Sequence, residues 1–282
     1  MQGYKIVHHT YYNFTQQVTL GPHELLLRPR EDHTQHIQSF ALRVQPDATL
    51  LWHQDVEGNS VAVATFENAA TQLAIESEVI LQQHNENPLD FLVADYAVHF
   101  PFTYDEDDAV LLAPYRTLEQ ERARNQLNAW IKTVWQASEN IQTYALLLRL
   151  AQHINTTLSY RVREEPGVQI AQQTLDSGTG SCRDFAFLFM QAARCLGLAA
   201  RFVSGYLYVP NLSNAGSTHA WAEVYLPGAG WLGFDPTTGE IVGADHFPVA
   251  VARLSESVPP VAGTFRGSAK SSLDVGVWVS RC

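Results

Sequence analysis

Cysteine is scarce in this 282-residue chain, with single residues at positions 182, 195 and 282. An odd number of cysteines gives no complete disulfide framework and suits a reducing compartment. No apolar run approaches the roughly 20 residues of a membrane-spanning helix, and the stretch from Met1 to Leu20 lacks the organisation of a signal peptide. We therefore expect a cytoplasmic protein without a membrane partner.

Basic residues are also few, with 18 Lys and Arg against 29 Asp and Glu, which gives a net charge of −11. Nucleic-acid backbones select basic patches, so we expect no nucleic-acid partner. The sequence carries neither of the common glycine-rich motifs that cradle phosphate. Histidines such as His8, His9, His33 and His36 lack cysteine or carboxylate partners at matching spacing, so we expect no metal and no cofactor.

The first part of the chain has the pattern of short β-strands. Phe40, Leu42 and Val44 alternate with polar residues, and Gly, Pro, Asp and Asn separate the alternating runs. Several short strands spaced by turns indicate a β-sandwich. We predict a β-rich, sandwich-like domain over residues 1–100, with strands at 4–8, 25–28, 39–44, 49–54, 61–66 and 73–81. Prolines and an acidic cluster at 105–108 mark residues 87–114 as a linker.

Residues 101–282 predict a second domain that mixes helices and strands, so the predicted fold class is α+β. Two helices are expected within 118–158, at 118–137 and 143–158. A further helix begins at Cys182 and ends before Gly197. This helix is expected to pack on an antiparallel sheet spanning 199–279, to which the tail adds a strand at 275–279.

Cys182 occupies the first turn of that predicted helix. Gly178 and Gly180 form a flexible turn, Ser181 is a candidate N-cap, and Asp184 is its candidate capping-box partner. Unpaired N–H groups and the positive end of the helix dipole favour an anion at this position. We therefore expect the thiol to ionise readily and to act as a nucleophile.

His219 and Asp235 are candidate partners for this thiol. Residues 217–226 alternate like a strand, and a Pro-Gly-Ala-Gly turn leads into a second strand that closes at Asp235. His219 and Asp235 would then lie at the same end of one hairpin. If Trp221 pairs opposite Asp235, His219 and Asp235 share a face as diagonal neighbours. A slip of one residue would place them on opposite faces.

Four segments together resemble the bacterial transglutaminase-like family of cysteine proteases. They are Gly-Ser-Cys-Arg-Asp-Phe-Ala at 180–186, Leu-Gly-Leu-Ala-Ala-Arg-Phe-Val-Ser-Gly-Tyr-Leu at 196–207, Thr-His-Ala-Trp-Ala-Glu-Val-Tyr at 218–225, and Gly-Phe-Asp-Pro-Thr-Thr-Gly at 233–239. The resemblance implies a papain/transglutaminase-like core in which Cys182 is the nucleophile, His219 the base and then the acid, and Asp235 the group that orients the imidazole. The front of the chain resembles the N-terminal region often joined to such a core.

The expected activity is hydrolysis of a peptide or protein amide through a thioester on Cys182. Tyr160 is a candidate side-chain donor to the oxyanion, since it precedes the nucleophile in a segment that should pass the cleft. Two alternatives stay open. An amine in place of water would make the protein a transglutaminase or another acyltransferase, and a pseudoenzyme would use the same cleft only to bind a peptide.

Overall fold

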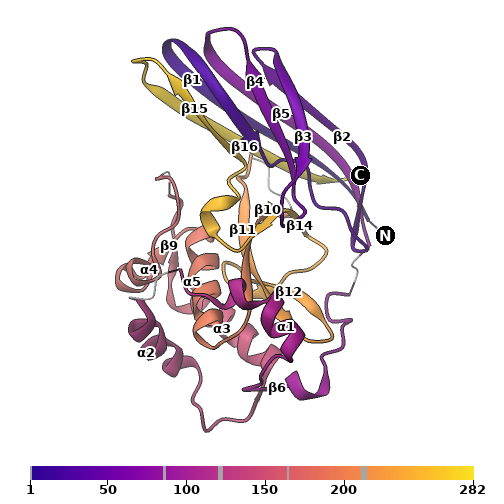
Figure 1. The fold of residues 1–282 in the computed structure, drawn as a ribbon, viewed down its shortest axis with the longest axis vertical. Coiled ribbons are helices and arrows are strands. Elements are labelled where there is room, and N and C mark those ends of the chain that lie inside the picture. The colour runs from indigo at the N-terminus through magenta and orange to yellow at the C-terminus, as the bar shows by residue number, and fades with distance from the viewer. Residues whose placement is uncertain (1, 85–86, 120–122, 164, 211–214) are drawn as a thin grey trace.

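The structure is a computed structural model that describes residues 2–84, 87–119, 123–163, 165–210 and 215–282. Figure 1 shows an N-terminal sheet stacked above a second sheet, which is flanked by helices. The α+β fold class, with a sandwich-like N-terminal part and a helix packed on an antiparallel sheet, is confirmed.

The N-terminal sheet is built around β1 (Gln2–Leu25), a single long strand. The first half of β1 lies between β5 and β16, and its second half lies between β4 and β15. The two outer strands are β2, which pairs with β5, and β3, which pairs with β4. The bounds of these strands are β2 Gln35–Gln45, β3 Ala48–Gln54, β4 Ser60–Phe66, β5 Ala70–Gln83, β15 Val261–Arg266 and β16 Ser271–Arg281.

Apolar side chains from both halves of this sheet form one buried cluster, which explains the sandwich-like shape. Phe14 and Leu25 of β1 pack there with Leu73 and Ile75 of β5 and with Ala64 of β4. The strand predicted at 4–8 lies within β1, and the strand predicted at 25–28 overlaps only the last residue of β1. Alternation alone could not show this, because the intervening polar residues also continue the strand.

The assignment of residues 199–279 to one sheet is wrong for its C-terminal part. β15 and β16 pair antiparallel with β1, with Tyr4 opposite Arg281 and Phe14 opposite Ser271. Figure 1 shows these strands, coloured yellow, beside the indigo β1. A division at residue 100 therefore omits the C-terminal strands that return to the N-terminal sheet. The alternating Val275, Val277 and Val279 favour a strand but do not select its partner.

The second sheet has the order β13-β12-β11-β10-β14, and α5 packs on β10 and β11. Its strands are β10 Ala200–Leu207, β11 His219–Leu226, β12 Gly230–Asp235, β13 Glu240–Ile241 and β14 His246–Ala252. The helices are α1 Glu106–Leu111, α2 Arg124–Val134, α3 Thr143–Thr157, α4 Ala171–Ser177 and α5 Cys182–Cys195. Short 3-10 turns lie at Asp95–Ala97, Ala113–Arg116 and Ser255–Ser257, and two short ladders pair β6 (His99–Phe100) with β7 (Ile141–Gln142) and β8 (Ser159–Tyr160) with β9 (Thr179–Gly180).

Two helical expectations need correction. The acidic cluster expected in a linker forms the start of α1, where the Asp105 side chain accepts a hydrogen bond from the Asp108 N–H. Acidic residues favour the positive end of a helix dipole, so the cluster also suits a helix start. The helix expected at 118–137 is shorter, because α2 covers Arg124–Val134, and residues 120–122 lie outside the described residues.

The two sheets are joined by a shared apolar cluster. Tyr4 and Ile6 of β1 and Val277 of β16 pack against Tyr206 of β10 and Phe247 of β14. The N-terminal sheet thus packs against β10 and against the start of β14. Across the residues that the structure describes, no helix combines the length and apolar character needed to cross a bilayer.

Candidate active site

Cys182 is the first residue of α5, and a capping interaction fixes the turn before it. The N–H of Ser181 donates to Asp184 Oδ2 at 2.8 Å, and the Ser181 hydroxyl donates to the same oxygen at 2.7 Å. Asp184 also accepts from the Gln169 N–H at 2.7 Å and from Arg163 Nε at 2.8 Å. Burial would raise the pKa of this carboxyl, but these hydrogen bonds hold it below its usual value. Asp184 therefore holds the helix start and the preceding loop together.

Tyr160 reaches Cys182 through a short parallel ladder. Tyr160 in β8 pairs with Gly180 in β9, two residues before the cysteine. The Tyr160 side chain is half exposed and lies beside the Cys182 side chain, which contributes to the pKa of the tyrosine. Burial and the neighbouring thiol raise the pKa of Tyr160, so its hydroxyl keeps the proton that a donor needs. The structure places this residue beside the thiol, and its role as oxyanion donor stays a prediction.

The hairpin of β11 and β12 has the register that brings His219 and Asp235 together. Ala222 pairs with Phe234, and one further step of the same register sets Trp221 opposite Asp235. His219 Nε2 lies 2.7 Å from Asp235 Oδ2. Gly205 of β10 faces His219 and leaves room for the neighbouring Trp221 ring, since a Cβ at 205 would lie 2.6 Å from that ring.

The side chain of Cys182 lies beside the His219 imidazole and contributes to the pKa of that ring. Because Nε2 is taken by Asp235, Nδ1 is the ring nitrogen left for the sulfur. Burial alone would lower the pKa of His219, but the interactions with Asp235 and Cys182 outweigh burial and raise this pKa to about 10. The imidazole is therefore hydrogen-bonded to the carboxylate and lies beside the sulfur, and its protonated form is favoured.

Asp235 is fully buried and accepts hydrogen bonds on both oxygens. Its Oδ1 accepts from the Thr237 N–H at 2.8 Å, and its Oδ2 accepts from His219. A second histidine, His246, lies with Nε2 at 3.2 Å from the same Oδ2. Burial would raise the pKa of Asp235, yet the two imidazoles hold it far below its usual range. The carboxylate therefore stays ionised.

His246 was missed by the sequence analysis, which considered only the chemistry of the hairpin and of the helix start. It is buried at the first position of β14, where Leu207 of β10 lies opposite. Neither the spacing nor the alternation of the sequence links residue 246 to residue 235 across this sheet. Only the pairing of β14 with β10 brings them together.

The cluster of His219, Asp235 and His246 has three side chains of the kind that bind metals. A tetrahedral zinc ion holds its ligands at about 2.0–2.2 Å, which sets neighbouring ligand atoms roughly 3.3 Å or more apart. The 2.7 Å between His219 and Asp235 is shorter than that spacing and matches a charge-assisted hydrogen bond. In this arrangement the cluster is spaced for hydrogen bonding.

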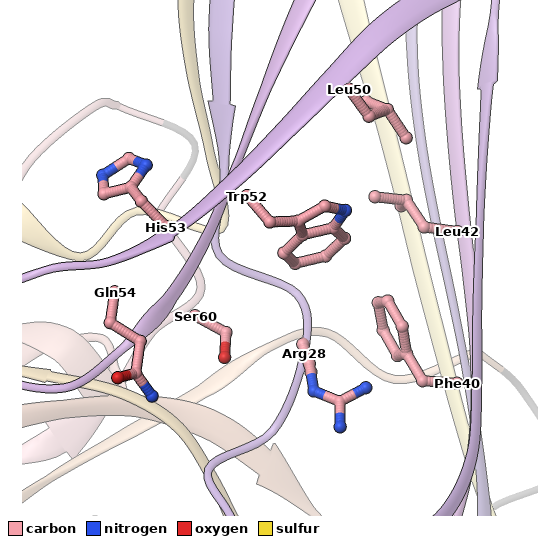
Figure 2. A pocket seen from close by; sticks show the side chains of 8 residues that line it. All are labelled: Arg28, Phe40, Leu42, Leu50, Trp52, His53, Gln54 and Ser60. Atoms are coloured by element: carbon pink, nitrogen blue, oxygen red, sulfur yellow. The ribbon is translucent and has the colours of Figure 1, made fainter.

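A separate cavity of about 640 Å³ opens in the N-terminal sheet between β2 and β3. Figure 2 shows the rings of Trp52 and Phe40 directed into it, and these rings are 5.8 Å apart in an edge-on arrangement. Its lining residues are Arg28, Phe40, Leu42, Leu50, Trp52, His53, Gln54 and Ser60. Cys182, His219, Asp235 and His246 do not belong to this lining, so the cavity is not part of the candidate active site.

Two family models match the chain in the order of its two sheets. Residues 4–82 match the bacterial transglutaminase-like N-terminal region, and residues 132–236 match the transglutaminase-like superfamily. The second match contains Cys182, His219 and Asp235, and His246 lies beyond it.

Three proteins illustrate these similarities. An uncharacterized protein of Mycobacterium leprae is 24% identical over 98% of both chains. An uncharacterized protein of Mycobacterium bovis is 34% identical over 47% of this chain and 46% of its own length. The crystal structure of a candidate cysteine protease from Cytophaga hutchinsonii is 20% identical, covers 99% of this chain and 90% of that one, and has a TM-score of 0.75. At this identity the structural match establishes the fold.

Proposed function

We propose that this chain, whose residues 132–236 match the transglutaminase-like superfamily and whose residues 4–82 match the bacterial transglutaminase-like N-terminal region, is a cysteine-dependent hydrolase of peptide or protein amide bonds. In this proposal Cys182 is the nucleophile, His219 the general base and acid, and Asp235 the group that orients the imidazole. The observation that carries the proposal is the 2.7 Å hydrogen bond between His219 and Asp235, beside a cysteine at the first position of α5.

The first half of the reaction forms a thioester. The proton of the Cys182 thiol passes to His219 Nδ1, and the sulfur attacks the carbonyl carbon of the scissile amide. The carbonyl oxygen becomes an oxyanion, which the Cys182 N–H at the start of α5 and the Tyr160 hydroxyl stabilise. The tetrahedral intermediate then expels the amine, which takes the proton from His219.

The second half returns the enzyme to its starting state. Water loses a proton to His219 Nδ1 and attacks the thioester carbonyl, and the C–S bond breaks to give a carboxylic acid and the Cys182 thiolate. An amine in place of water would give a new amide and make the protein a transglutaminase. We favour water, because no dedicated amine site is visible in the sequence.

Tyr160→Phe is expected to lower kcat about 100-fold with little change in KM, because loss of one oxyanion donor weakens only the transition state. The folded state should be retained, since half of the Tyr160 side chain already contacts solvent. Steady-state kinetics on a labelled casein check this result. Tyr96→Phe is the matched control, because Tyr96 is 49% exposed against 50% for Tyr160 and packs on Phe102. Equal rates for both variants would remove Tyr160 from the oxyanion site.

The thiol chemistry is tested by alkylation with iodoacetamide near pH 6, followed by peptide mapping. Cys282 is exposed and Cys182 is only partly exposed, so access alone favours Cys282. A thiol reacts faster when a neighbouring imidazole takes up its proton, and His219 lies beside Cys182. We expect Cys182 to react at least ~10-fold faster, and a faster reaction at Cys282 would contradict the proposal.

The reaction type is tested by incubating the protein with casein and a labelled amine. Hydrolysis predicts shorter casein fragments without label, whereas amine transfer predicts labelled casein of full length.

We propose the cytoplasm as the location, in keeping with the small and odd number of cysteines, and cell fractionation checks it.

A further inference from the structure

His246 contacts the candidate active site but has no part in the steps above. It is the first residue of β14, and its side chain is 7% exposed. The ring lies edge-on to Trp221, with ring centroids 5.3 Å apart and planes at 81°. The fully buried Trp221 therefore limits rotation of the imidazole.

The hydrogen bonds of His246 define which nitrogen carries its proton. The N–H of Gly243 donates to His246 Nδ1 at 3.4 Å, so Nδ1 acts as an acceptor. In the neutral ring the proton then lies on Nε2. Nε2 donates to Asp235 Oδ2 at 3.2 Å. Asp235 Oδ2 consequently receives hydrogen bonds from two imidazoles at once.

This second imidazole restrains the carboxylate. The Thr237 N–H anchors Oδ1, and His219 approaches Oδ2. The bond from His246 fixes Oδ2 from a different strand, so the carboxylate plane cannot rotate without breaking a charge-assisted hydrogen bond. A displaced Oδ2 would no longer hold His219 Nε2, and His219 Nδ1 would lose its alignment with the sulfur.

His246 also borders a cavity whose lining does not include Asp235. This cavity has a volume of about 440 Å³ and is bounded by Tyr144 and Leu148 of α3 and by Gly239 and Ile241 beyond the hairpin. A smaller side chain at position 246 would let water approach Asp235. Water would compete for Oδ2 and would weaken the attraction between the carboxylate and the His219 imidazolium.

We propose that His246 is a positioning residue, which acts through Asp235 to hold the His219 imidazole in line with the Cys182 thiol. The inference rests on the proposed function for its effect on turnover, but the alignment of imidazole and thiol can be measured without turnover. The arrangement is a row of four side chains drawn from α5, β11, β12 and β14.

The test compares His246→Phe, His246→Asn and His246→Gln in the full chain. Phenylalanine keeps the ring volume and removes the donor. Glutamine places an amide N–H near the position of Nε2, whereas the shorter asparagine does not reach Asp235. We expect kcat on labelled casein to fall about 10- to 100-fold in the Phe and Asn variants with KM unchanged, and to recover at least in part in the Gln variant.

A second readout is the rate of Cys182 alkylation by iodoacetamide near pH 6. This rate should fall in the Phe and Asn variants and recover at least in part in the Gln variant. His23→Phe serves as the control, because His23 is as buried as His246, at 6% exposure, but lies in the N-terminal sheet against Phe66. If the unmodified protein did not cleave casein but the His246 variants still differed in alkylation as expected, the proposed function would be wrong and the positioning role of His246 would stand. Wild-type kcat and alkylation in folded His246→Phe and His246→Asn would overturn the role of His246.

Discussion

Cys182→Ala is expected to lower the rate of amide hydrolysis by ~10⁴-fold or more. The sulfur forms and breaks the bond to the acyl group in the proposed reaction, and no other atom at the start of α5 can replace it. The Ser181 and Asp184 contacts that fix the helix start do not involve the sulfur. The variant should therefore fold, with a midpoint of thermal unfolding within a few degrees of the unmodified protein.

The matched control for this variant is Cys195→Ala. Cys195 is the last residue of the same helix and, like Cys182, packs against the apolar cluster that includes Phe185 and Phe189 of α5. Casein hydrolysis and circular dichroism on both variants separate loss of the nucleophile from loss of packing. Comparable activity of Cys182→Ala and the unmodified protein would show that hydrolysis proceeds elsewhere in the chain or in a contaminant.

Asp235→Asn is expected to lower kcat by ~10³- to 10⁴-fold, because an amide cannot satisfy the donors that surround this position. The Thr237 N–H points at Oδ1, and His219 and His246 approach Oδ2. An asparagine must place its NH₂ group against one of these donors. An NH₂ donating to His219 Nε2 would shift the ring proton to Nδ1, which then cannot accept a proton from the thiol.

The same variant should change the dependence of activity on pH. The pKa of His219 is raised to about 10 because the interactions with Asp235 and Cys182 outweigh burial. In the unmodified protein kcat/KM should therefore stay high above pH 6.5 and fall only as pH approaches 10. In Asp235→Asn burial is opposed by fewer interactions, so the alkaline fall should move to lower pH. A pH profile of kcat/KM on labelled casein checks this shift.

The free energy of unfolding should also depend on pH through these two groups. His219 has a folded-state pKa above its unfolded value, so it contributes stability below pH 6.5 that is lost as pH rises toward 10. Asp235 has a depressed pKa, so its contribution is present above pH ~3.9 and is lost as pH falls. Urea unfolding of Asp235→Asn should show a smaller decline between pH 6.5 and 10 than the unmodified protein shows.

The control for Asp235→Asn is Glu240→Gln. Glu240 lies opposite Asp235 in the pairing of β12 with β13, yet its side chain is exposed. Loss of one negative charge from this end of the sheet should leave kcat and its pH profile unchanged. If kcat/KM fell at the same alkaline pH in Asp235→Asn and in the unmodified protein, Asp235 would not be what raises the pKa of His219.

The local parts of the candidate site could be predicted because short-range physics decides them. A Ser and an Asp three residues apart set the start of α5, and Gly197, with a φ of +83°, ends it. The hairpin that carries His219 and Asp235 follows from alternation and a glycine-containing turn. Its register was left conditional, because both registers use the same alternating residues.

Predictions that depended on long-range pairing were less successful. The strand expected at 275–279 in the second sheet is part of β16 (Ser271–Arg281), which pairs with β1, more than 250 residues away in the chain. The acidic residues at 105–108 suit both a solvated linker and a helix start, and in the structure the Asp105 side chain caps a helix. α4 was not predicted, because its seven residues carry too little apolar periodicity.

By itself the sequence determined which side chains carry the proposed chemistry and where each lies in its own element, since capping, alternation and turns act over a few residues. The tertiary structure alone decided that the register brings His219 to Asp235, that β14 brings His246 to the same carboxylate, and that the end of the chain completes the first sheet. These contacts join strands that the sequence does not pair, because many strand partners satisfy the same alternation and only the packed core selects among them.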